Sequence, residues 1–92
     1  MAETVDELTV HYEEDGKILV KELAKEVLTK GAWATIMYKY QDMNKASGEY
    51  GPEKVTIRRY KKQNGVYRAQ SKFNISNEKQ AKQVAEVLTG WF

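Results

Sequence analysis

The dipeptide Asn64-Gly65 constrains the fold of this chain more than any other feature. It separates two runs that are rich in β-branched and aromatic side chains, residues 54–62 and 66–75. A two-residue turn of type I′ requires positive φ at both central positions, which Asn and Gly adopt more readily than other residues. Residues 54–75 are therefore predicted to form a β-hairpin.

The predicted hairpin is strongly basic. From Lys54 to Lys72 the sequence has seven Lys or Arg residues and no Asp or Glu, whereas the whole chain has a formal net charge of only +2. Residues 1–15 hold six acids and no Lys or Arg. A basic body attracts anions through its summed field, so a polyanion is the expected class of partner. The open alternative is that the basic face is merely solvated, or that the acidic segment lies across it.

Length and composition are typical of one domain spanning residues 1–92, with an acidic arm at residues 1–7 that can stay disordered. The chain has no cysteine, which excludes disulfides and thiolate chemistry. Its first residues are acidic, unlike a signal peptide, and no apolar run reaches the length of a membrane span. We therefore expect a protein of the cytoplasm, either free there or associated with the nucleoid.

Alternating apolar and polar residues predict strands near residues 6–13 and 33–41, and Asp15-Gly16 predicts a tight turn after the first of them. Residues 18–30 leave two alternatives open. Their apolar side chains fall at helical spacing among good helix formers, whereas the preceding turn favours an immediate partner strand.

After residue 75 the apolar period changes from two to 3.6, which predicts a helix at about residues 77–89 with Ser76 or Asn77 as its N-cap. The expected fold class is α+β. It comprises an antiparallel sheet of four or five strands, with the C-terminal helix covering one face.

Alternation within the hairpin has one conflict, because Val55 and Ile57 fall on the same face as the basic residues. A β-bulge near Arg58-Arg59 would shift the register by one and turn Val55, Ile57 and Tyr60 into the core. The side chains then predicted to form one outward basic strip are Arg58 or Arg59 together with Lys61, Arg68, Gln70 and Lys72.

Residues suited to catalysis are few. His11 is the single histidine, and the chain has no phosphate-cradling loop and no nucleophile motif. The sequence therefore predicts a protein that is not an enzyme and that uses no cofactor, metal ion or small-molecule substrate.

Nucleic-acid binding requires cations that neutralise phosphates and, for single strands, aromatic surfaces on which bases stack. The predicted sheet offers both. The candidate phosphate-binding residues are Arg58, Arg59, Lys61, Lys62, Arg68, Lys72 and Lys39. The candidate stacking residues are Trp33, Tyr60 and Tyr67, for which core packing is the competing explanation.

The run from Lys54 to Tyr60, the glycine turn, residues 71–76 and a helix that opens with Glu78 and Gln80 resemble one known family. This is the positive cofactor four family of single-stranded-DNA-binding transcriptional coactivators, and the resemblance covers about residues 33–89. It implies a homodimer whose curved sheets hold separated DNA strands, a coactivator-like role in transcription, and contacts of Arg58 and Lys72 with the DNA backbone.

The sequence thus favours non-catalytic binding of nucleic acid, either single-stranded DNA or RNA, through a sheet face opposite the helix, and the family resemblance favours DNA. The alternative is a protein-interaction or self-assembly module. In that case the basic hairpin would dock an acidic partner, such as the acidic N-terminal arm of a second copy.

Overall fold

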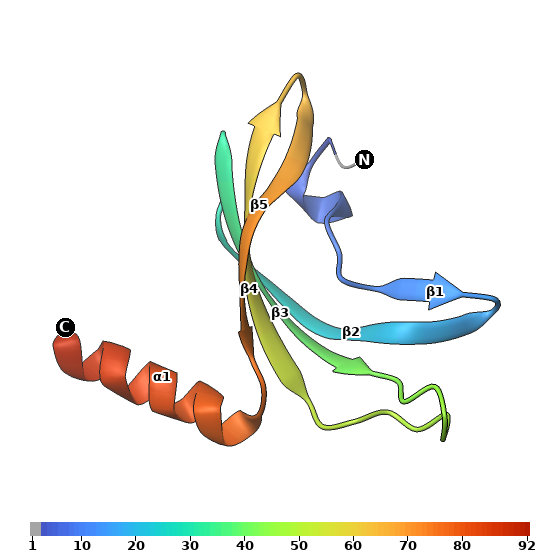
Figure 1. Ribbon diagram of the computed structural model, residues 1–92. Coiled ribbons are helices and arrows are strands. Elements are labelled where there is room, and N and C mark those ends of the chain that lie inside the picture. The colour runs from blue at the N-terminus through green and yellow to red at the C-terminus, as the bar shows by residue number, and fades with distance from the viewer. Residues whose placement is uncertain (1–2) are drawn as a thin grey trace.

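The computed structural model describes residues 3–92, which form a five-stranded antiparallel sheet, a short 3-10 turn and one C-terminal helix (Figure 1). The strands are β1 (Tyr12–Glu14), β2 (Lys17–Thr29), β3 (Trp33–Asp42), β4 (Lys54–Gln63) and β5 (Val66–Ile75). The 3-10 turn spans Val5–Glu7 and the helix is α1 (Glu78–Trp91). The predicted α+β class is confirmed at this level.

The strands lie in the sheet in chain order, each antiparallel to the next. Asn64 and Gly65 have φ values of 53° and 80°, the positive pair that a type I′ turn requires, so the predicted hairpin is confirmed. Asp15 and Gly16, at 51° and 76°, form the corresponding turn between β1 and β2. The sheet is strongly curled and therefore has an inner and an outer face (Figure 1).

Residues 17–29 form a strand, so the helical alternative for residues 18–30 is wrong. The pairing of β2 with β3 shifts at two bulges, where Leu23 and Leu28 have no partner in β3. Each bulge adds one residue and shifts the alternation of side chains. The spacing along β2 is therefore a mixture of two and three residues, which resembles a helical pattern. Its side chains on the inner face are Val20, Glu22, Lys25 and Val27.

A bulge also interrupts the hairpin beside Arg59, where one was predicted, but the extra residue is in β5 and not in β4. Arg59 pairs with Ser71 and Tyr60 pairs with Ala69, which leaves Gln70 without a partner. The alternation of β4 is consequently unbroken.

The predicted inward orientation of the apolar residues of β4 is therefore only partly correct. Tyr60 does point inward, together with Thr56 and Arg58, whereas Val55 and Ile57 point to the outer face. A bulge in β5 does not change which side chains of β4 face the core.

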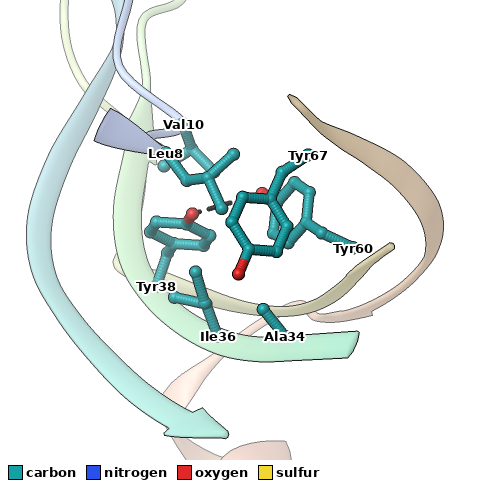
Figure 2. Packing of buried hydrophobic residues seen from close by; sticks show 7 residues of the cluster. All are labelled: Leu8, Val10, Ala34, Ile36, Tyr38, Tyr60 and Tyr67. Atoms are coloured by element: carbon teal, nitrogen blue, oxygen red, sulfur yellow. Dashed lines mark hydrogen bonds between the residues drawn. The ribbon is translucent and has the colours of Figure 1, made fainter. Parts of the chain in front are cut away.

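The inner face holds the hydrophobic core (Figure 2). On β3 every second side chain is buried, and Ala34, Ile36 and Tyr38 are at most 1% exposed. Strands β4 and β5 contribute Tyr60 and Tyr67. The remaining buried side chains of this cluster come from the N-terminal segment, which closes the core from the concave side (Figure 2).

The N-terminal segment crosses the inner face and does not form the strand predicted near residues 6–13. Only Tyr12–Glu14 pair with β2, and residues 8–11 form no ladder. Leu8 and Val10 are each 8% exposed, so the alternation in the sequence marks burial and not strand pairing. The arm predicted at residues 1–7 includes the 3-10 turn, while residues 1–2 lie outside the described residues.

Helix α1 projects from the end of β5 and does not lie across a face of the sheet, contrary to the prediction (Figure 1). None of its residues is buried, and Trp91 is 74% exposed. Because Leu8 and Val10 already fill the inner face, no place remains there for the helix.

The start of α1 is fixed by side chains. Asn77 is the N-cap, and its side-chain oxygen accepts a hydrogen bond from the Gln80 amide at 2.8 Å. The side chain of Gln80 in turn accepts from the Ser76 amide at 2.9 Å. Within residues 3–92 no helix is long and apolar enough to cross a membrane.

Tyr38 lies at the centre of the core, with its hydroxyl 3.2 Å from that of Tyr60. Burial, and then the hydrogen bond with Tyr60, raise the pKa of Tyr38 above the ordinary tyrosine value of about 10. Since an unfolded chain ionises this phenol first, its contribution to stability is complete below about pH 10 and decreases as the pH rises further.

We expect Tyr38→Phe to leave the phenolate absorbance of the folded protein at about pH 11 unchanged, because the native Tyr38 is still protonated there. Ultraviolet difference absorbance measures this, with circular dichroism to confirm that the protein is folded. The control is the same pair of proteins unfolded in denaturant, in which Tyr38→Phe should lower the absorbance because the phenol of an unfolded chain ionises at about pH 10. An equal decrease in the folded and the unfolded proteins would contradict the buried state of Tyr38.

Candidate nucleic-acid interface

Backbone alternation assigns the cations of the hairpin to opposite faces of the sheet. Lys61 pairs with Arg68 on the outer face, whereas Arg58 pairs with Lys72 on the inner face. Arg58 and Lys61 lie on opposite faces because β4 alternates without a break, and the bulge at Gln70 separates Lys72 from Arg68 because it reverses the alternation of β5. The single outward strip predicted from the sequence is therefore divided between two faces.

On the outer face Trp33 is the residue around which cations gather. Its side chain is 42% exposed, and the Arg59 guanidinium carbon lies 4.7 Å from its ring centroid. The Lys61 ammonium lies 5.4 Å from the same centroid. Such cation–π contacts orient both the ring and the charges. We refer to Trp33, Arg59, Lys61 and Arg68 together as the outer basic patch.

Most hairpin cations have no carboxylate partner. Lys54 pairs with Asp42 at 3.1 Å, and no other Lys or Arg of the hairpin forms an ion pair within residues 3–92. The cations without such a partner are Arg58, Arg59, Lys61, Lys62, Arg68 and Lys72. Among the N-terminal acids of the same residues, Glu13 contacts a basic side chain, and that side chain is His11. The acidic segment therefore does not neutralise the hairpin through direct ion pairs.

Lys39 differs from the other predicted cations. It lies on the outer face of β3 and forms an ion pair with Glu53. The hydrogen bond to that carboxylate raises the pKa of Lys39. Since its charge is already compensated, Lys39 is not part of the outer basic patch.

Arg58 and Lys72 lie directly opposite each other on the inner face. Like charges in this cross-strand position repel. The Arg58 Nε is buried and has no hydrogen-bond partner, which is unfavourable for a donor. This pair therefore consists of two cations without a carboxylate partner within residues 3–92, and the Arg58 Nε is covered in this conformation.

The two hairpin tyrosines predicted as stacking residues belong to the core. Tyr60 and Tyr67 are 5% and 8% exposed. The Tyr67 hydroxyl donates to the Gly31 carbonyl at 2.6 Å, and the Lys62 ammonium lies 5.5 Å from its ring. Of the three predicted aromatic residues, Trp33 alone is accessible for stacking in this conformation.

Two residues of β2 hold the N-terminal segment in place, and the sequence patterns did not reveal them. The Lys25 ammonium donates to the carbonyl oxygens of Val5 and Leu8, at 2.7 Å each. A Glu22 carboxylate oxygen accepts from the Thr9 hydroxyl at 2.6 Å. Only a strand assignment with the bulge at Leu23 in place would have put both side chains on the same face.

No group of three or more His, Cys, Asp or Glu side chains within residues 3–92 is arranged to hold a metal ion. His11 is 2.9 Å from the Glu13 carboxylate.

No protein-family model matches the chain, and no curated protein or solved structure matches it. The resemblance to the positive cofactor four family therefore stays a prediction that depends on residues of β3, β4, β5 and α1. A function must instead be inferred from the geometry of the two sheet faces.

Proposed function

We propose that the protein binds single-stranded nucleic acid, preferentially DNA, through the outer basic patch and without catalysis. The observation that carries the proposal is an exposed Trp33 ring beside Arg59 and Lys61, whose charges have no carboxylate partner within residues 3–92. An aromatic face accepts any base, and unpaired cations neutralise phosphates. This combination suits an unpaired strand.

The arrangement of the patch supports this function physically. Neighbouring strands lie about 4.8 Å apart, so Trp33 on β3 and Arg68 on β5 are separated by about 10 Å across the sheet. A strand that stacks one base on Trp33 would therefore reach the cations of β4 and β5 with adjacent phosphates. The resemblance to the positive cofactor four family adds an expected preference for DNA, a coactivator-like role in transcription and a place in the cytoplasm or on the nucleoid.

The two faces of the hairpin provide a matched test with variants of equal charge. Arg59→Ala/Arg68→Ala removes two exposed cations of the outer face, and Lys62→Ala/Lys72→Ala removes two exposed cations of the inner face. We expect the outer variant to bind an oligothymidylate about 10-fold more weakly at low salt. We expect a change of less than about 3-fold for the inner variant.

Fluorescence anisotropy at several salt concentrations measures these affinities. The slope of log K against log salt should decrease by about 0.7 for each phosphate that the outer variant no longer neutralises. Absence of binding by the native protein at low salt would refute the proposal. Equal weakening by both variants would refute the assignment to the outer face.

We propose self-assembly into a homodimer as a second function, because helix α1 has an apolar side that nothing covers. Val87 and Leu88 are each 48% exposed, and Trp91 is more exposed still. A 14-residue helix with no buried residue is marginally stable in water, since most helical stability comes from packing of its apolar face. A second copy of the chain presents the same stripe and can cover it in a symmetric pair.

We expect the native protein to sediment at twice the mass of one 10.6 kDa chain, and Leu88→Glu to sediment as a monomer. The control is Thr89→Glu, which adds the same charge at the adjacent exposed position. Analytical ultracentrifugation in low and high salt distinguishes two modes of assembly. A helix interface should resist salt, whereas docking of an acidic arm on a basic hairpin should dissociate. A native monomer at all concentrations would exclude both.

A further inference from the structure

The inner face of the sheet is occupied by the chain itself. Residues 5–10, which we call the N-terminal strap, lie along the concave side, where Leu8 and Val10 contact the aromatic cluster (Figures 1 and 2). The strap carries Asp6 and Glu7 and has no Lys or Arg. An acidic segment thus covers the face on which Arg58 lies.

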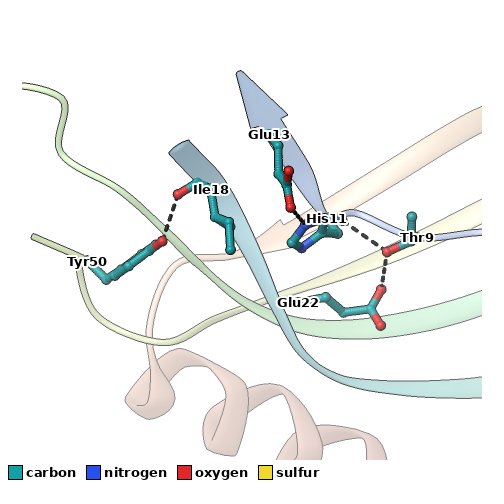
Figure 3. A network of polar contacts seen from close by, with 6 residues as sticks. All are labelled: Thr9, His11, Glu13, Ile18, Glu22 and Tyr50. Carbon is teal, nitrogen blue, oxygen red and sulfur yellow. Dashed lines mark hydrogen bonds and ion pairs between the residues drawn. The ribbon is translucent and has the colours of Figure 1, made fainter. Parts of the chain in front are cut away.

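The strap is attached through side chains and not through a strand ladder. Pairing of the N-terminal segment with β2 begins only at Tyr12. The Lys25 ammonium connects β2 to the strap through the Val5 and Leu8 carbonyls, with a longer contact of 3.4 Å to the Asp6 carbonyl. Glu22 connects β2 to the Thr9 hydroxyl (Figure 3). The Val10 amide adds a longer contact of 3.4 Å to the same Glu22 oxygen. Displacement of the strap would therefore leave every sheet hydrogen bond intact.

The surface beneath the strap has the composition of a second binding site for a single strand. It contains the rings of Tyr38, Tyr60 and Tyr67, with the hydroxyls of the first two in contact. Beside them lie Arg58, with its unpartnered Nε, and Lys72. Aromatic rings next to uncompensated cations provide the same chemistry as the outer basic patch.

We propose that the N-terminal strap is a tethered competitor for this inner site, and that single-stranded nucleic acid displaces it to bind Arg58, Lys72 and the tyrosine rings. The proposal rests on the proposed nucleic-acid binding. Attachment to the same chain gives the strap a high effective concentration, so the native protein uses mainly its outer patch at low ligand concentration. Weakening of the strap should raise affinity by increasing the fraction of open protein.

The test compares Lys25→Met with Lys30→Met. Both remove one positive charge, but Lys25 donates to three strap carbonyls and Lys30 is an exposed residue outside the strands. We expect Lys25→Met to bind oligothymidylate about 5-fold more tightly than Lys30→Met at equal salt. Simple loss of charge predicts no difference between the two. If Lys25→Met does not fold, Thr9→Val removes the hydroxyl that donates to Glu22 without changing the charge, and it is expected to show the same gain over the native protein.

Hydrogen exchange at the Val10 amide provides the second measurement, in the free and the oligonucleotide-saturated native protein. Faster exchange in the complex supports displacement of the strap. Unchanged exchange in the complex, or equal affinity of the two Lys variants, overturns the proposal. Binding by Lys25→Met but not by the native protein would support the strap and refute the outer patch. Absence of binding by either protein would refute both.

Discussion

Burial of Leu8 and Val10 against the aromatic inner face is the contact that closes the core of this fold. A strongly curled sheet leaves a concave apolar surface that must be covered, and these two side chains cover it from the N-terminal side. Full burial of such side chains contributes about 1.5–3 kcal/mol each. Since the inner face is filled from this end of the chain, helix α1 and the outer face are free for other contacts.

A single extra residue then determines how charge is distributed. The bulge at Gln70 places Arg68 on the outer face and Lys72 on the inner face, although these residues are four positions apart on one strand. Without it, alternation would have put both on the same side. The outer face thereby gains Arg68 opposite Lys61, while Lys72 lies opposite Arg58 on the inner face.

The parts of the fold that could be predicted from sequence are those set by local chemistry. Asn64-Gly65 and Asp15-Gly16 determine their turns through positive φ, and Asn77 caps the helix with its own side chain. The two bulges of β2 could not be predicted, because they produce a spacing that resembles a helix. The residue types of the site were predictable, but their faces were not, since the bulge at Gln70 carries no glycine or proline that would mark it.

The environment of Trp33 reports directly on whether nucleic acid binds the outer face. The chain has two tryptophans, so Trp91→Phe leaves Trp33 as the single source of tryptophan fluorescence in the protein. Titration of this variant with oligothymidylate, followed by tryptophan fluorescence, reports whether a base stacks on the exposed ring. Stacking on Trp33 predicts saturable quenching that weakens as salt rises. Saturable binding that leaves the Trp33 emission unchanged would contradict a binding site on the outer face.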